Sequence, residues 1–207
     1  MKFYTLILSL LTFSFFSYSQ EYKAVSNKNS VKQVIQKQHS ATKSLSADFT
    51  EEIHSTLFTK PMKGNGSLLY KQADKIRWEN SSAKQIILLN GSKVKMSDNG
   101  KSISDPMTNK IVKKIQGMML SMLSGDFLNE KDFSIAYYEN NNLYKLILTP
   151  KNQRMAKYLQ KIELQFTKQT LLLWQMKMFE SKDQQLVYIF SNTKVNTAIN
   201  ESKFNQF

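Results

Sequence analysis

Few side chains in this sequence could perform catalysis or bind a metal. The chain of 207 residues contains two histidines, His39 and His54, and no cysteine. Neither histidine belongs to an HxH or HExxH motif, the spacings that bring two imidazoles to one metal ion. Glu51 and Glu52 are adjacent in an expected strand, so they point to opposite faces and cannot form a carboxylate pair. We therefore predict a protein that is not an enzyme, with no catalytic residue, no metal site and no cofactor.

The N-terminus has the pattern of an export signal. Lys2 precedes an apolar run from Phe3 to Phe16, and small side chains follow at Ser17 and Ser19. The run is shorter than the about 20 residues that span a bilayer. We expect a signal peptide over residues 1–19 and one domain over residues 20–207, with an uncleaved anchor as the alternative. Because no cysteine could be acylated after the signal, the expected product is a soluble periplasmic protein.

The charge of the chain is strongly basic and comes almost entirely from lysine. The formal net charge is +13, and Arg77 and Arg154 are the only arginines. Lysines occur in every segment, without the arginine-rich or aromatic-interleaved motifs of nucleic-acid binders. The composition indicates a solvated surface or weak attraction to anionic lipid headgroups, and no nucleic-acid partner.

Half-apolar strands joined by tight turns make up most of the chain. A helix is expected from Ser30, where Ser30–Gln33 matches a capping box, and its apolar positions continue to Leu45. Asn-Gly turns separate several of the strands that follow. The pattern predicts an α+β fold with about eleven antiparallel strands and two helices that cover one apolar face. The expected strands lie within residues 46–55, 66–79, 85–98, 100–105, 133–139, 143–149, 161–166, 171–180 and 185–192.

A second helix is expected over residues 109–123, with a methionine-rich stripe. Met118, Met119 and Met122 share one face of this helix. Methionine is flexible and polarisable, so such a stripe suits a lid over a cavity that receives variable apolar partners. Ordinary core packing is the alternative interpretation of the same stripe.

In this order, the segments resemble the bacterial outer-membrane lipoprotein carrier family LolA. The resemblance covers roughly Val31 to Phe204, and the segments GDFLNEKDF and YYEN are similar to those of Bacteroidetes-type members. It implies an unclosed antiparallel β-barrel whose concave apolar face is covered by helices. The segments that carry the resemblance are SADFTEE, KGNGSLLYKQADKIRWEN, QIILLNGSKV, LILTP, KIELQF and FSNTKVNTAINESKF.

The resemblance also implies a function. A member of this family is a monomeric periplasmic carrier that holds lipoprotein acyl chains in a hydrophobic cavity. It receives acylated lipoproteins from an inner-membrane ABC transporter and delivers them to an outer-membrane acceptor or membrane surface. A carrier of free lipids or polyketide-like acyl products and an acyl-sensing signalling domain are the alternatives.

The family's cavity-lining positions fall on Ile76 and Trp78 of this sequence. Strand alternation extends the expected cavity along the neighbouring strands, and the central helix adds its methionines. Where the family commonly has Arg-Pro, with the arginine latching the lid, this chain has Gln72-Ala73, so Lys71 or Arg77 is the candidate substitute. The expected acyl-chain-binding residues are Leu68, Tyr70, Ile76, Trp78, Ile86, Leu88, Met118, Met119 and Met122.

Overall fold

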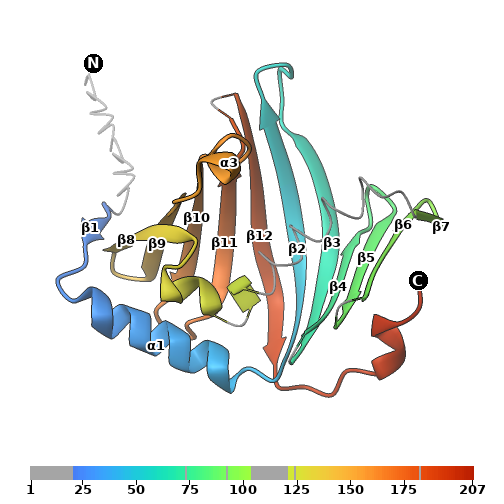
Figure 1. Ribbon diagram of the computed structural model, residues 1–207, viewed down its shortest axis with the longest axis horizontal. Helices are drawn as coiled ribbons and strands as arrows, with labels where there is room; N and C mark the ends of the chain where they lie inside the picture. Colours follow the sequence, from blue (N-terminus) through green and yellow to red (C-terminus); the bar gives the residue numbers. More distant parts are fainter. Residues whose placement is uncertain (1–20, 73, 92, 104–120, 124, 182) are drawn as a thin grey trace, which may run out of the picture.

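One curved antiparallel sheet of 12 strands forms most of the structure, and it does not close into a barrel (Figure 1). The computed structural model describes residues 21–72, 74–91, 93–103, 121–123, 125–181 and 183–207. The expected signal peptide lies outside the described residues. The predicted fold class is confirmed: a long meander of strands forms an open sheet, accompanied by a few helices.

The strands follow each other in space largely as they do in the sequence. Their order in the sheet is β1-β8-β9-β10-β11-β12-β2-β3-β4-β5-β6-β7. The two-residue strand β1, which the sequence did not predict, pairs with β8 at one edge. The strands are β1 (Lys23–Ala24), β2 (Ser44–Ser55), β3 (Met62–Lys71), β4 (Lys75–Asn80), β5 (Gln85–Asn90), β6 (Lys93–Asp98), β7 (Lys101–Ile103), β8 (Phe133–Glu139), β9 (Leu143–Pro150), β10 (Lys161–Thr167), β11 (Leu173–Phe179) and β12 (Gln184–Val195).

Tight turns fix the register of the hairpins. Asp98 pairs with Lys101 across the β6–β7 turn. The two turn residues, Asn99 and Gly100, have φ angles of 49° and 77°. Two consecutive positive φ angles define the type I′ turn that suits the right-handed twist of a hairpin, and Asn-Gly is its preferred sequence.

Helix α1 (Lys28–Ala41) starts two residues before its predicted first residue and ends earlier than predicted. Asn27 caps it, because the Asn27 side chain accepts a hydrogen bond from the Ser30 amide at 3.1 Å. Leu45, expected at the end of this helix, belongs to β2. Residues 121–123 are helical, and the rest of the expected second helix lies outside the described residues. Among the described residues no helix is long and apolar enough to cross a bilayer.

The hydrophobic core lies between the sheet and helix α1, and we call the face of the sheet toward α1 the concave face. Figure 1 shows α1 across the end of the sheet at which β2 begins. Val31 and Ile35 of α1 are buried in the same core as Phe49 and Leu68 of the sheet. Three further short elements complete the fold: η1 (Asp126–Asn129), α3 (Gln153–Ala156) and η2 (Glu201–Phe204).

Candidate functional site

Four of the predicted cavity residues lie together on the concave face. Leu68 pairs with Trp78, and Tyr70 pairs with Ile76, across the β3–β4 hairpin. Directly opposed residues in an antiparallel pair point to the same face, so all four side chains share one side of the sheet. Leu68, Tyr70 and Ile76 are buried in the core, and Trp78 packs against it partly buried.

The prediction was wrong about the face of β5. Ile86 and Leu88 pair with Glu79 and Arg77, so they lie on the convex side of the sheet. The residues of β5 that face Trp78 and Ile76 are Ile87 and Leu89. A shift of one residue exchanges the two faces of a strand. The sequence Ile-Ile-Leu-Leu is apolar at every position, so alternation could not identify the concave face.

The convex side of β4 and β5 is covered by the C-terminal segment, residues 196–207. Its turn η2 packs against both strands, and Phe204 and Leu88 are both 1% exposed. The Arg77 guanidinium donates to the carbonyl oxygens of Lys203 and Gln206, at 3.2 and 2.7 Å. This packing explains why an apolar residue at position 88 is buried although it points away from the main core.

Two lysines hold the same segment through Glu201. The Glu201 carboxylate forms ion pairs with Lys71 and with Lys75, the latter at 2.6 Å. Hydrogen bonds from Lys71 and then Lys75 lower the pKa of Glu201 to about 2. Lys71 and Arg77, the candidate substitutes for the lid latch, both bind the C-terminal segment on the convex side.

An aromatic cluster lies on the concave face where β12, β2, β3 and β4 are neighbours. The rings of Phe49 and Trp78 stack with centroids 4.2 Å apart. Tyr188 meets both rings edge-on, at 5.7 Å from Phe49 and 5.2 Å from Trp78. Phe190 contacts Phe49 at 6.4 Å. Such pairs add specific geometry to the burial of large apolar surfaces.

A buried carboxylate lies beside this aromatic cluster. The Tyr188 hydroxyl donates to Glu51 Oε1 at 2.6 Å, and Asn80 Nδ2 donates to Glu51 Oε2 at 2.8 Å. Burial, and then the hydrogen bond to Glu51, raise the pKa of Tyr188 above its ordinary value. Both carboxylate oxygens thus have donors, which offsets the cost of placing Glu51 on an apolar face.

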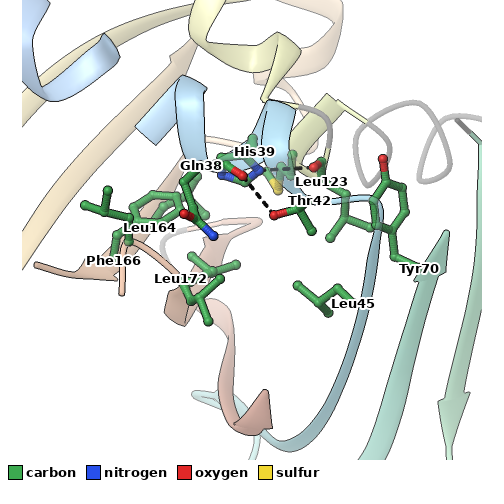
Figure 2. A pocket seen from close by; sticks show the side chains of 12 residues that line it. Gln38, His39, Thr42, Leu45, Tyr70, Leu123, Leu164, Phe166 and Leu172 are labelled. Atoms are coloured by element: carbon green, nitrogen blue, oxygen red, sulfur yellow. Dashed lines mark hydrogen bonds between the residues drawn. The ribbon is translucent and has the colours of Figure 1, made fainter. Parts of the chain in front are cut away.

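A small cavity of about 50 Å³ lies between helix α1, residues 122–123 and the sheet (Figure 2). Its lining is mostly apolar, and the polar side chains in it belong to the C-terminal end of α1 and to Tyr70 of β3. The Thr42 hydroxyl is turned back to the Gln38 carbonyl at 2.8 Å, which removes one of these polar groups from the cavity. The lining residues are Gln38, His39, Thr42, Leu45, Tyr70, Met122, Leu123, Leu164, Phe166, Leu171, Leu172 and Leu173.

His39 connects helix α1 to the segment after the undescribed residues. Its Nδ1 lies 3.1 Å from the Leu123 carbonyl oxygen, and a carbonyl only accepts, so Nδ1 carries the proton (Figure 2). The ring packs edge-on against Phe127 and Phe166. Its Nε2 is buried without a partner in the part of the chain that the structure describes. Burial lowers the pKa of His39, and the hydrogen bond to Leu123 partly opposes that shift.

Of the predicted methionines and the second histidine, only Met122 lines this cavity in the described part of the chain. Met122 is 8% exposed and belongs to the core, whereas Met118 and Met119 lie outside the described residues. His54 binds Glu52 at 3.1 Å near the far end of β2. Within the described ranges, no three metal-binding side chains gather in one place.

Sequence reasoning had not assigned His39, Tyr188 or Phe190 to the site. Tyr188 and Phe190 reach Phe49 only because β12 pairs with β2. The two strands are far apart in the chain, and the Tyr188–Glu51 hydrogen bond joins residues 137 positions apart. Phe49 lies two residues after Ala47 in β2, so the two side chains share one face of the strand. This spacing is the sequence signal that places Phe49 on an apolar face.

Comparison with known proteins identifies one family. The family model described as "Outer membrane lipoprotein carrier protein LolA" matches residues 40–206. No curated protein sequence matches the chain.

Solved structures with a similar arrangement have very different sequences. A LolA superfamily protein from Nitrosomonas europaea is 10% identical, with a TM-score of 0.44, over 84% of this chain and 96% of that one. A putative outer membrane lipoprotein-sorting protein domain from Vibrio parahaemolyticus is 8% identical, with a TM-score of 0.44, over 85% and 95%. LprF from Mycobacterium bovis is 11% identical, with a TM-score of 0.41, over 86% and 99%. The assignment to a family therefore rests on the family model.

Proposed function

Because this chain belongs to the outer membrane lipoprotein carrier family LolA, we propose that it is a non-enzymatic carrier of lipoprotein acyl chains. It takes these chains up at the inner membrane and releases them at the outer membrane. The observation that carries this proposal is the apolar concave face closed by α1, Met122 and Leu123 around a cavity of only about 50 Å³. We interpret this arrangement as the empty, closed state of a carrier.

The energetics of an acyl chain require such a binding surface. Each methylene moved from water to an apolar site gains about 0.8 kcal/mol, so a sixteen-carbon chain gains about 12 kcal/mol. The chain therefore needs a protected apolar path between two membranes. A carrier must also release it, so its affinity has to stay comparable to that of a bilayer.

The closed state reconciles these two requirements. A cavity of about 50 Å³ has the volume of only one or two waters, at about 30 Å³ each. An acyl chain can enter only if α1 and the segment of Met122 and Leu123 move away from the sheet. Separating these apolar surfaces costs free energy, and this cost lowers the net affinity for the chain below its full transfer energy.

The acyl chain would lie between the concave face and these helical segments. We place it against Leu68, Tyr70, Ile76 and Trp78, which were predicted from the sequence, and against Leu89 in place of Leu88. Met122 would contact it from the opposite side, together with Met118 and Met119 if these extend the same surface. The convex residues Ile86 and Leu88 have no place in this site.

The cellular route follows from the family assignment and the export signal in the sequence. We propose that the protein acts as a monomer in the periplasm after removal of residues 1–19. An inner-membrane ABC transporter would load it, and an outer-membrane acceptor or the membrane surface would receive the cargo.

Two measurements test the proposal. Mass spectrometry of the protein purified from its native periplasm should detect acylated lipoproteins or their acyl peptides. Free lipids without a lipoprotein would instead assign free acyl lipids as the cargo, and the repeated absence of any acyl compound would contradict the proposal.

Substitution then tests the position of the site. Trp78→Glu places a charge on the concave face and should abolish binding of a fluorescent fatty acid. Ile86→Glu is a matched control, because Ile86 lies on the same hairpin but on the convex side, and it should bind the fatty acid as the parent does. Circular dichroism of both variants shows whether the sheet is intact. Equal binding by two folded variants would place the site elsewhere.

A further inference from the structure

The β2–β3 hairpin carries exposed apolar side chains at its tip, residues 56–62. Leu57 is 86% exposed, and Phe58 and Met62 are each 48% exposed. Figure 1 shows this hairpin reaching beyond the neighbouring strands at the end of the sheet opposite α1. Single exposed apolar residues are common on proteins, but a projecting turn that presents three together marks an interaction site.

Hydrogen bonds hold the hairpin tip in this conformation. The Phe58 amide donates to the Ser55 carbonyl at 3.1 Å, and the Leu57 amide donates to Ser55 Oγ at 3.2 Å. The Thr56 amide donates to the Asp183 carbonyl at 3.1 Å, which fixes the base of the turn to β12. The outward position of Leu57 is therefore built into the turn.

A second exposed aromatic residue lies at the same end of the sheet. Tyr158, 73% exposed, belongs to the connection between β9 and β10. That connection ends where Lys161 pairs with Phe179, and Phe179 pairs with Gln185 beside the end of β2. Figure 1 likewise shows α3 and the hairpin tip at one end of the sheet. The other large apolar side chains exposed in the described ranges are Val34, Trp174 and Phe207, and none of them belongs to these two connections.

The charged side chains of these two connections are all basic, while Glu52 and Asp183 lie next to the base of the hairpin. Residues 56–63 and 151–161 contain no acidic residue. Some of the basic groups have partners elsewhere, such as Lys63, which binds Glu52 at 3.0 Å. The basic residues of the two segments are Lys60, Lys63, Lys151, Arg154, Lys157 and Lys161.

We propose that this end of the sheet docks on the surface of a bilayer that contains anionic lipids. Leu57 and Phe58 enter the boundary between headgroups and acyl chains, and Lys60, Arg154 and Lys157 lie against the headgroup phosphates. Apolar side chains flanked by cations are the combination that binds membrane interfaces. The inference goes beyond the proposed carrier function, because it concerns a surface remote from the cavity and holds for any cargo.

Vesicle sedimentation tests the docking surface. The protein should sediment with vesicles of phosphatidylcholine and phosphatidylglycerol and much less with phosphatidylcholine alone. The double variant Leu57→Ser/Phe58→Ser should lower partitioning by about tenfold or more, because two large apolar side chains no longer enter the interface. Lys60→Gln should lower it by about fivefold at low salt. The matched control Trp174→Ser removes an exposed aromatic residue at the other end of β11. It should leave partitioning onto the vesicles unchanged.

A second measurement reports insertion directly. The emission of a Leu57→Trp variant should gain a component that brominated lipids quench, relative to the parent protein. The proposal is overturned if the parent does not bind the anionic vesicles, or if the double serine variant binds as the parent does. Capture of a protein partner by the hairpin tip without vesicle binding would also overturn it. Fatty-acid binding by the double serine variant should be normal, so failure of the docking surface is distinct from failure of the carrier site.

Discussion

The close packing at Gly66 makes one substitution especially informative. A Cβ atom added at Gly66 would lie 2.0 Å from the Glu79 carbonyl oxygen and 2.4 Å from Cζ of Phe49. The first atom is backbone in the paired strand β4, and the second belongs to a ring that is stacked on Trp78. Gly66→Ala should therefore force the two strands apart and break the ring stack. We expect a loss of about 3 kcal/mol in the free energy of unfolding, at the upper end of overpacking costs, although alanine otherwise gains about 0.5–1 kcal/mol over glycine in a strand.

Urea unfolding followed by tryptophan emission measures this effect, and fatty-acid binding shows its consequence for the site. Gly64→Ala is the matched control, since Gly64 lies two residues away on the same face of β3. There the nearest atom to the added Cβ is Glu51 Oε2 at 3.2 Å, which has to shift by only a few tenths of an ångström. We expect the control to change stability by less than about 1 kcal/mol. If Gly66→Ala were as stable as the control, the tight contact of Phe49 with β3 and β4 would be refuted.

Three further substitutions test polar groups in the core and its rim. Tyr188→Phe should destabilise the protein by about 1–3 kcal/mol because Glu51 loses a donor. Tyr137→Phe should cost little, because the Tyr137 hydroxyl is buried without a partner in the described part of the chain. Equal losses of unfolding free energy by the two variants in urea would contradict this prediction. For His39, whose pKa is lowered by burial, the unfolded chain binds more protons, so stability is full above about pH 6.5 and decreases as the pH falls below it. His39→Gln should flatten the decrease in stability below about pH 6.5. An unchanged curve would show that His39 does not cause this decrease.

Much of the sheet could be predicted from the sequence, because strand length, alternation and Asn-Gly turns are local signals. The β3–β4 hairpin shows this well: Ile76 and Trp78 alternate with charged residues, and the structure places them on one face with Leu68 and Tyr70. The uniformly apolar β5 carries no such signal, so its faces were assigned incorrectly. Its register depends on the turn after Asn80, which pairs with Gln85.

Features that depend on distant pairing could not be predicted. The aromatic cluster requires β12 beside β2, and the covering of Leu88 requires the C-terminal segment to return to β4 and β5. The N-cap of α1 was assigned to the wrong residue, because Asn27 and Ser30 are both good caps and the sequence alone does not choose between them. Asn27 provides the cap in the structure.

The path of the C-terminal segment bears on how the protein can change its volume. Ser44 Oγ donates to the Thr197 carbonyl at 2.6 Å at the start of β2, and farther along Arg77 and Lys75 of β4 hold residues 201–206. The C-terminal segment thus connects β12 to β4 and β5 across the convex side of the sheet. Flattening the sheet would stretch the C-terminal segment and break the ion pairs of Glu201. In the proposed carrier, the cavity must therefore enlarge around an acyl chain by movement of the helical segments, while the sheet keeps its curvature.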